Sequence, residues 1–91
     1  MSRERRTAES IFGEHLRALR TSAGLSQEAL AEKAGLHRNY IGHIKRGEKT
    51  ASLDVLVRLA AALKLSLPAL LESFDSRTVR ALLGKQRGWQ G

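Results

Sequence analysis

The chain has 91 residues, enough for one small hydrophobic core and too few for two cores of ordinary size. Sixteen Lys and Arg against nine Asp and Glu give a formal net charge of +7 at pH 7, a balance that favours phosphate-bearing partners or anionic membranes. The absence of cysteine excludes disulfides, thiolate zinc sites and cysteine nucleophiles, and no apolar run is long enough to cross a bilayer or to act as a secretory signal. We therefore expect one cytoplasmic domain, stabilised by packing alone and with no membrane partner.

Helices are predicted throughout, because Leu, Ala and Glu are plentiful and no long stretch alternates apolar and polar residues. The first helix is expected to end at Gly24, in a left-handed conformation. Its apolar stripe consists of Phe12, Leu16, Leu19 and Ala23. Ser26 is expected to cap a second, short helix that has Glu28 in its first turn and ends at Gly35. The inward-facing residues of this helix are predicted to be Leu30, Ala31 and Ala34.

Serines mark the starts of two later helices. One begins after Ser52 and is expected to bury a face made of Leu53, Leu56, Ala60 and Leu63. Another begins after Ser66 with Pro68 in its first turn, where a missing N–H costs least, and its buried candidates are Leu67, Leu70, Leu71 and Phe74. Asp75 or Ser76 could cap a last short helix that contains Val79, Leu82 and Leu83 and stops at Gly84. The predicted fold is thus all-α, with five helices and a short extra C-terminal helix.

The third predicted helix lies within LHRNYIGHIKRG, residues 36–47, which contains no carboxylate. Its apolar residues recur at helical spacing and are Leu36, Tyr40, Ile41 and Ile44. A solvated helix face usually mixes both signs of charge, because opposite charges one turn apart stabilise each other. The polar face of this helix is therefore predicted to meet a polyanion.

The second and third helices are joined by AGLH, residues 34–37, which is the helix-turn-helix arrangement. Gly35 supplies the positive φ that the turn needs. Arg38, Asn39 and His43 then project from the exposed half of the second of these helices, the part that enters the major groove in this motif. Arg suits guanine O6 and N7, and Asn suits adenine N6 and N7.

Residues 9–74 resemble the DNA-binding domain of the lambda repressor and Cro family, the xenobiotic-response-element type of helix-turn-helix. The resemblance is carried by LRALRTSAGLSQEALAEKAGLHRNYIGHIKRGEKTASLDVLVRLAAALKLS. Within that family, a Tyr-Ile pair after Arg-x is typical of restriction-modification controller proteins and also of many phage and cellular repressors. It implies a lambda-repressor-like fold in which Arg38, Asn39 and His43 read bases. The residues expected to bind phosphate are Gln27, Tyr40, Lys45, Arg46 and Lys49.

The sequence departs from the family pattern at two positions. Relatives commonly have glutamate in place of Lys45, paired with an arginine that corresponds to Arg20. Here Lys45 would have to turn towards a phosphate, or Arg20 would have to pair with Glu48 or Glu28, because an unpaired buried cation is costly. His37 replaces the usual Ser, Thr or Asp at the cap of the third helix and is expected to be a weaker cap when neutral.

The leading interpretation is a sequence-specific, double-stranded-DNA-binding transcriptional regulator that acts as a homodimer on an operator with two-fold symmetry. Residues 1–8 are expected to form a flexible basic arm, and residues 75–91 a basic extension that is either disordered or used in dimerisation. The candidate dimer residues are Leu67, Leu71, Val79, Leu82 and Trp89. The sequence does not say whether the regulator is a repressor or an activator.

Two other functions compete with this interpretation. One is an antitoxin-like or adaptor module that binds a protein partner through residues 75–91 and regulates itself through DNA, and the other is non-specific packaging of nucleic acid. An enzyme is not expected, since no nucleophile elbow is present and so small a domain leaves little room for a substrate pocket. No cofactor or metal is expected either, because His15, His37 and His43 have no acidic partner at ligand spacing.

Overall fold

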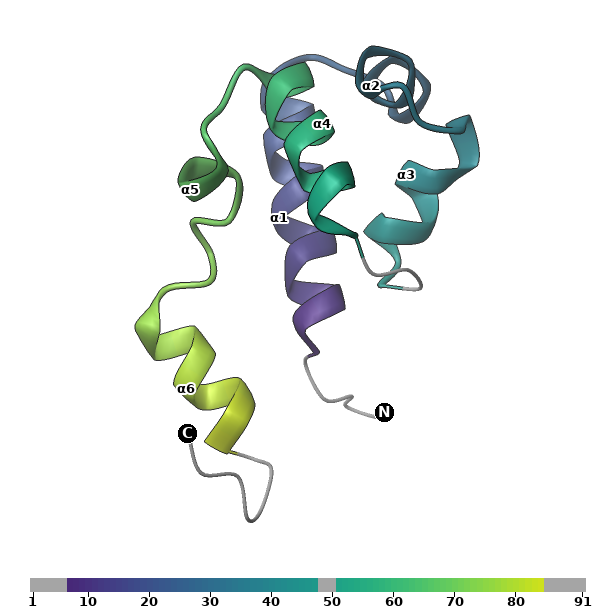
Figure 1. The fold of residues 1–91 in the computed structure, drawn as a ribbon. Helices are drawn as coiled ribbons and strands as arrows, with labels where there is room; N and C mark the ends of the chain where they lie inside the picture. Colours follow the sequence, from purple (N-terminus) through teal and green to yellow (C-terminus); the bar gives the residue numbers. More distant parts are fainter. Residues whose placement is uncertain (1–6, 48–50, 85–91) are drawn as a thin grey trace.

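The computed structural model describes residues 7–47 and 51–84, which form six α-helices and no strand (Figure 1). In chain order the helices are α1 (Ala8–Ser22), α2 (Gln27–Ala34), α3 (Arg38–Lys45), α4 (Leu53–Leu63), α5 (Leu67–Leu70) and α6 (Ser76–Gly84). This confirms the predicted all-α fold with a short extra C-terminal helix. Several predictions fall outside the described residues: residues 1–6 of the arm predicted for residues 1–8, the proposed contacts of Glu48 and Lys49, and Trp89 in the C-terminal extension.

Helix α1 is closed at both ends by local hydrogen bonds. Thr7 and Ser10 form a reciprocal capping box: the Ser10 N–H donates to Thr7 Oγ1 at 3.0 Å, and the Thr7 N–H donates to Ser10 Oγ at 3.1 Å. Gly24 has φ 74°, which confirms the left-handed residue expected after the helix. Ala23, however, is the C-cap and is exposed, so its place in the buried stripe was wrong. The stripe is buried at Phe12 and Leu16.

The helix-turn-helix unit consists of α2, its turn and α3. Ser26 caps α2 as predicted, because the Ala29 N–H donates to Ser26 Oγ at 3.0 Å. Gly35 has φ 72°, and the next N–H, that of Leu36, donates to the Ala31 carbonyl at 2.8 Å. The left-handed glycine therefore turns the chain sharply between the two helices.

Helix α4 buries a slightly different stripe from the predicted one. Leu59 is fully buried and Ala60 is buried, but Leu53 is 70% exposed. Leu53 is the first residue of the helix and lies at the edge of the stripe that runs through Leu56, Leu59, Ala60 and Leu63, so it does not reach the core. The helix ends at Lys64, which takes the left-handed conformation with φ 60°.

Helix α5 begins after Ser66 with proline in its first turn, as predicted, but it is only four residues long. Of its four candidate core residues only Leu70 is buried. Leu67, Leu71 and Phe74 are half-buried and pack against the edge of the core. The expected buried stripe runs from Leu67 to Phe74 and needs about two turns of helix. Because α5 ends at Leu70, the residues after it do not continue the same inner face.

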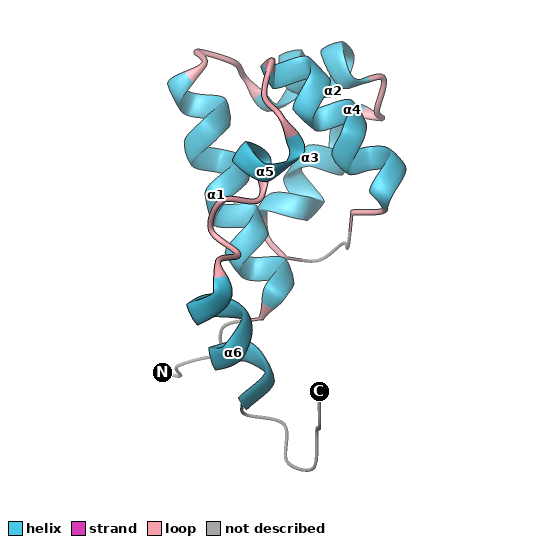
Figure 2. Cartoon of the chain, turned by 60° about the vertical axis from the view of Figure 1, so that its left-hand side comes forward, coloured by secondary structure: helices cyan, strands magenta, loops and turns pink. Residues whose placement is uncertain are grey.

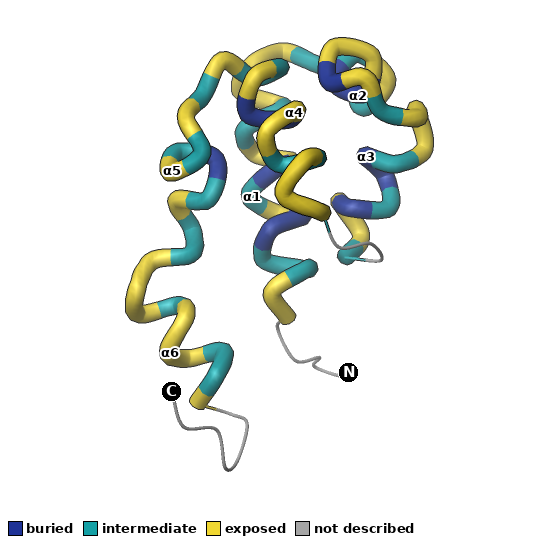
Figure 3. The backbone as a smooth tube through the Cα atoms, in the orientation of Figure 1, coloured by how far each residue is buried: buried dark blue, intermediate teal, exposed yellow. Residues whose placement is uncertain are grey.

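The core lies between α1, α2, α3 and α4 and includes Leu70 of α5, and the buried segments are dark blue in Figure 3. Gly13 brings α1 and α3 together: a Cβ atom at this position would lie 2.4 Å from the Ile44 carbonyl oxygen and 2.7 Å from that of Lys45. Only glycine permits this approach of two helices. The buried apolar residues are Phe12, Leu16, Leu30, Ala31, Ala34, Ile41, Ile44, Leu59, Ala60 and Leu70.

Helix α6 extends away from this body, past the start of α1 (Figure 2). Asp75 caps it, because the Thr78 N–H donates to Asp75 Oδ1 at 2.9 Å, which confirms one of the two predicted caps. None of its residues is buried. Its apolar residues line a groove whose opposite side is the start of α1 and which also includes Phe74.

Candidate nucleic-acid interface

Helix α3 has two faces with different surroundings. On the inner face, Ile41 and Ile44 are at most 1% exposed and seat the helix on its neighbours. On the outer face, Arg38, Asn39 and Lys45 are exposed. Because no carboxylate occurs between Leu36 and Gly47, this outer surface carries positive charge and hydrogen-bond donors without a competing acid on the same helix.

His37 caps the N-terminus of α3 through its ring. The Asn39 backbone N–H donates to His37 Nδ1 at 3.1 Å, so the imidazole supplies the acceptor that Ser, Thr or Asp supplies at other helix starts. The acceptor nitrogen must be unprotonated, which places the proton of the neutral ring on Nε2. This hydrogen bond fixes the backbone of the first turn of α3, from which the side chains of Arg38 and Asn39 project.

Three other predicted site residues meet around Gly42. Arg46 Nη2 lies 3.3 Å from His43 Nδ1. A Cβ atom on Gly42 would lie 3.3 Å from Arg46 Nη1 and 3.4 Å from Gln27 Oε1. The missing side chain at Gly42 therefore leaves the space in which Arg46 and Gln27 lie against α3. Glycine is unfavourable inside a helix, and these two neighbours give the reason for its place here.

Among the described residues, the partner of Arg20 is a backbone carbonyl and not the carboxylate of Glu28. Its Nη1 donates to the Leu25 carbonyl at 2.7 Å, across the turn between α1 and α2. Lys45, at the position where relatives commonly have glutamate, is exposed. The sequence placed two cations, Arg20 and Lys45, where relatives have an ion pair. In the structure the Leu25 main-chain carbonyl accepts a hydrogen bond from Arg20.

Arg58 is a further supporting residue that the sequence did not reveal. Its Nε donates to Asp54 Oδ2 at 2.9 Å, and its Nη1 lies 3.5 Å from the Ala34 carbonyl at the end of α2. A Cβ on Gly35 would lie 2.9 Å from the same Nη1. Helix α4 thus packs an arginine against the turn of the helix-turn-helix unit. An i,i+4 Asp–Arg pair of this spacing was readable in the sequence, but its contact with a turn 24 residues away was not.

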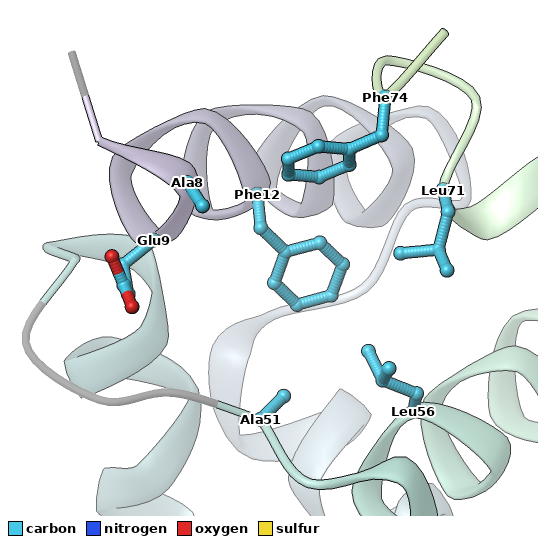
Figure 4. A pocket seen from close by; sticks show the side chains of 7 residues that line it. All are labelled: Ala8, Glu9, Phe12, Ala51, Leu56, Leu71 and Phe74. Carbon is cyan, nitrogen blue, oxygen red and sulfur yellow. The ribbon is translucent and has the colours of Figure 1, made fainter. Parts of the chain in front are cut away.

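The recess shown in Figure 4 offers no comparable set of chemical groups. Glu9 is the one charged residue among those that line it, and its other lining residues are Ala8, Phe12, Ala51, Leu56, Leu71 and Phe74. Within residues 7–47 and 51–84, no three His, Cys, Asp or Glu side chains gather as a metal site would require. In the same part of the chain, no helix is both long and apolar enough to cross a membrane.

Comparison with known proteins agrees with this geometry. A family model described as helix-turn-helix matches residues 16–70. The chain belongs to this helix-turn-helix family. The match includes α2, α3 and α4 in full and ends at Leu70, so α6 lies beyond it.

Among the relatives of this helix-turn-helix protein are control proteins. It is 48% identical over 63 residues to the control protein C.SmaI of Serratia marcescens, a match that covers 69% of this chain and 75% of that protein. It is 43% identical over 54 residues to the control protein C.BamHI of Bacillus amyloliquefaciens, with 58% and 67% covered. The crystal structure of the restriction-modification controller protein C.AhdI from Aeromonas hydrophila superimposes with a TM-score of 0.67 at 45% identity, over 68% of this chain and 94% of that one.

The helix-turn-helix protein is therefore a DNA-binding transcriptional regulator of the Cro and C1 type, homologous to restriction-modification controller proteins. The family is one of regulators and not of enzymes. The antitoxin-like or adaptor alternative is not favoured by these relatives.

Proposed function

We propose that the protein regulates transcription as a homodimer that recognises an operator with two-fold symmetry, α3 of each copy lying in the major groove. The observation that carries this proposal is the outer face of α3, which is exposed and acid-free while its inner face is fixed in the core. Similarity to control proteins supports a role in controlling a restriction-modification system. Action on DNA of this kind implies a cytoplasmic location.

We assign two roles to the side chains of this surface. Base edges are read by Arg38, Asn39 and His43, because these residues lie in the N-terminal and middle part of α3. We assign phosphate binding to Gln27, Tyr40, Lys45, Arg46 and Lys49. Gln27 supports this arrangement because its side-chain oxygen lies over Gly42, at the edge of α3. Lys49 lies outside the described residues and stays a prediction from the sequence.

A homodimer is proposed because one such module buries too little surface for high affinity, whereas two place their recognition helices about 34 Å apart, one turn of the DNA helix. Residues 9–74 form the DNA-binding domain in this proposal, with residues 1–8 as an arm and 75–91 as an extension. The dimer candidates from the sequence are Leu67, Leu71, Val79, Leu82 and Trp89. Leu53 and Val57 on α4, 70% and 49% exposed, join them as unburied apolar side chains.

Selection of bound duplexes from a random DNA pool with the full chain tests this function. The expected product is a site with two similar half-sites in inverted orientation, and competition with random DNA should show at least a thousandfold preference, about the lower end for specific binders. Recovery of a single half-site without symmetry would contradict the dimer. A specificity ratio near one would contradict the whole proposal and favour packaging of nucleic acid.

Variants of two exposed cations on α3 separate base reading from phosphate binding. Arg38→Ala should cost about 1–3 kcal/mol of binding free energy and relax the preference at one base pair, whereas Lys45→Ala should weaken all sequences alike and reduce the salt slope by about one unit. Titrations at several salt concentrations on the selected site and on a random duplex measure both effects. Uniform loss by both variants would mean that Arg38 does not read a base.

A further inference from the structure

The end of α2 accepts a hydrogen bond from a different helix. The last carbonyls of an α-helix have no partner within the helix and need one from elsewhere. At this helix end the Leu36 N–H donates to the Ala31 carbonyl at 2.8 Å. The Ala34 carbonyl, at the last residue of α2, accepts from Arg58 Nη1 of α4 at 3.5 Å. The cation of α4 therefore lies at the end of α2 where the helix dipole favours positive charge.

Arg58 is oriented towards the turn by its own helix. Its Nε donates to Asp54 Oδ2 at 2.9 Å, one turn earlier in α4. A Cβ atom on Gly35 would lie 2.9 Å from Arg58 Nη1, so the guanidinium group occupies the space beside the left-handed glycine. A guanidinium presents its donors in a fixed planar arrangement, which allows one edge to bind the carboxylate while another binds the carbonyl. The Asp54–Arg58 pair thus connects α4 to the turn between α2 and α3.

This connection is too exposed to contribute much to folding. The side chains of Arg58 and Asp54 are 49% and 74% exposed, and ion pairs in such surroundings contribute little to stability. Recognition of bases is more sensitive to position, because the groups of a binding site must be held to within about 0.5 Å. Helix α3 begins at Arg38, three residues after Gly35. A small shift of the turn therefore moves the base-reading end of α3 while the core stays intact.

We infer that Arg58 is a positioning residue for operator specificity: it holds the turn that sets the direction of α3, and Asp54 orients Arg58 for this task. The inference rests on the proposed function, in which α3 reads bases. Arg58 acts here through α3 and not through a DNA contact of its own. Its loss should weaken the specific operator more than random DNA, because phosphate contacts tolerate small shifts of α3 better than base contacts do.

The test uses the full chain, its selected operator and a random duplex, titrated at several salt concentrations. Arg58→Ala should reduce the ratio of the two affinities about fivefold and leave the salt slope on the random duplex unchanged. Arg80→Ala is the matched control, because it removes an exposed cation from α6, which extends away from the body, and it should keep the wild-type ratio. If Arg58 bound a phosphate itself, Arg58→Ala would weaken both duplexes alike and reduce the salt slope by about one unit.

Asp54→Ala distinguishes orientation from charge by the sign of its effect. Removal of an acid makes the protein more positive, so an effect of charge alone would strengthen binding to both duplexes. The inference predicts a lower ratio instead, by about twofold to fivefold, because Arg58 is no longer oriented. In the Arg58→Ala background, Asp54→Ala should not lower the ratio further. Glu72→Ala, which removes an exposed acid after α5, should keep the wild-type ratio.

Amide hydrogen exchange of the free protein examines the turn without DNA. The Leu36 amide should exchange faster in Arg58→Ala than in the wild type, while the Leu30 amide near the start of α2 serves as the reference and stays protected. Circular dichroism confirms that each variant is folded at the temperature of the binding assay.

Three results would overturn the inference and leave the proposed regulator intact. They are an unchanged affinity ratio in Arg58→Ala, equal losses on both duplexes with a smaller salt slope, and losses from Asp54→Ala and Arg58→Ala that add in the double variant. Failure to select any specific site would instead contradict the proposed function.

Discussion

The body formed by α1 to α5 and the last helix, α6, are both rich in leucine but are stabilised in different ways. In the body, six large side chains are less than 2% exposed, and the helices approach closely enough for Gly13 to touch the backbone of α3. Helix α6 has no buried residue, and its defined local support is the Asp75 cap. The contrast indicates that the body folds through its own core, while α6 depends on local bonds and on whatever covers its apolar side.

Matched leucine truncations should show the largest difference between the two regions. Leu59→Ala removes a fully buried side chain and should lower the free energy of unfolding by about 3 kcal/mol, through lost burial and a cavity. Leu82→Ala makes the same chemical change on the half-buried face of α6 and should cost less than about 1 kcal/mol. Urea denaturation at low protein concentration measures both. Equal losses would mean that α6 belongs to the cooperative core.

Gly13→Ala tests how closely α1 and α3 are packed. A Cβ would lie 2.4 Å from the Ile44 carbonyl oxygen, so the helices must separate, and we expect a loss of about 2 kcal/mol although alanine favours helix formation. Gly84→Ala is the matched control, since a Cβ there meets no neighbouring atom. Thermal melts of the two variants should differ clearly. A neutral Gly13→Ala would show that α1 can shift without cost.

His37→Ala tests the cap of the recognition helix. Loss of the acceptor for the Asn39 N–H should lower stability by about 1 kcal/mol. His37→Asn restores a side-chain acceptor at the same position and should retain the wild-type stability. Denaturation curves compare the three proteins, and hydrogen exchange of the Asn39 amide reports the contact directly. If the Asn and Ala variants melt together, the imidazole does not act as a cap.

Asp75 should give the smallest and most local effect. The hydrogen bond from the Thr78 N–H lowers the pKa of the Asp75 carboxyl below its ordinary value. A carboxyl with a lowered folded-state pKa stabilises the helix above its unfolded pKa and loses this contribution as pH falls through the folded value. Helix α6 should therefore fray in strong acid, below the ordinary pKa of 3.8, and Asp75→Asn should remove this pH dependence. Amide signals of residues 78–81 followed by NMR at each pH measure it.

The helices could be predicted from the sequence where their starts, ends and buried faces depend on neighbouring residues. Serine caps, the glycines that end α1 and α2, and the apolar spacing of α3 all depend on residues within one or two turns of each other, and the structure confirms them. The errors at Ala23 and Leu53 came from the ends of helices, where a continued periodic pattern no longer corresponds to a buried face.

The supporting contacts of the site were not readable, because they join distant parts of the chain. Gly13 in α1 contacts carbonyls 31 and 32 residues away, and Arg58 reaches Ala34. A glycine inside a helix indicates some constraint but not its partner. The roles of Arg38, Asn39 and Tyr40 stay predictions from the sequence.

The packing of α3 against the core also affects how the protein could be redesigned. Its position is set by Ile41, Ile44 and the main-chain carbonyls against which Gly13 rests, none of which faces outward. Residues 38, 39 and 43 can therefore be randomised together in a library while the scaffold keeps its geometry. This separation of inward-facing from outward-facing residues would let the outer surface of α3 change while the buried contacts stay the same.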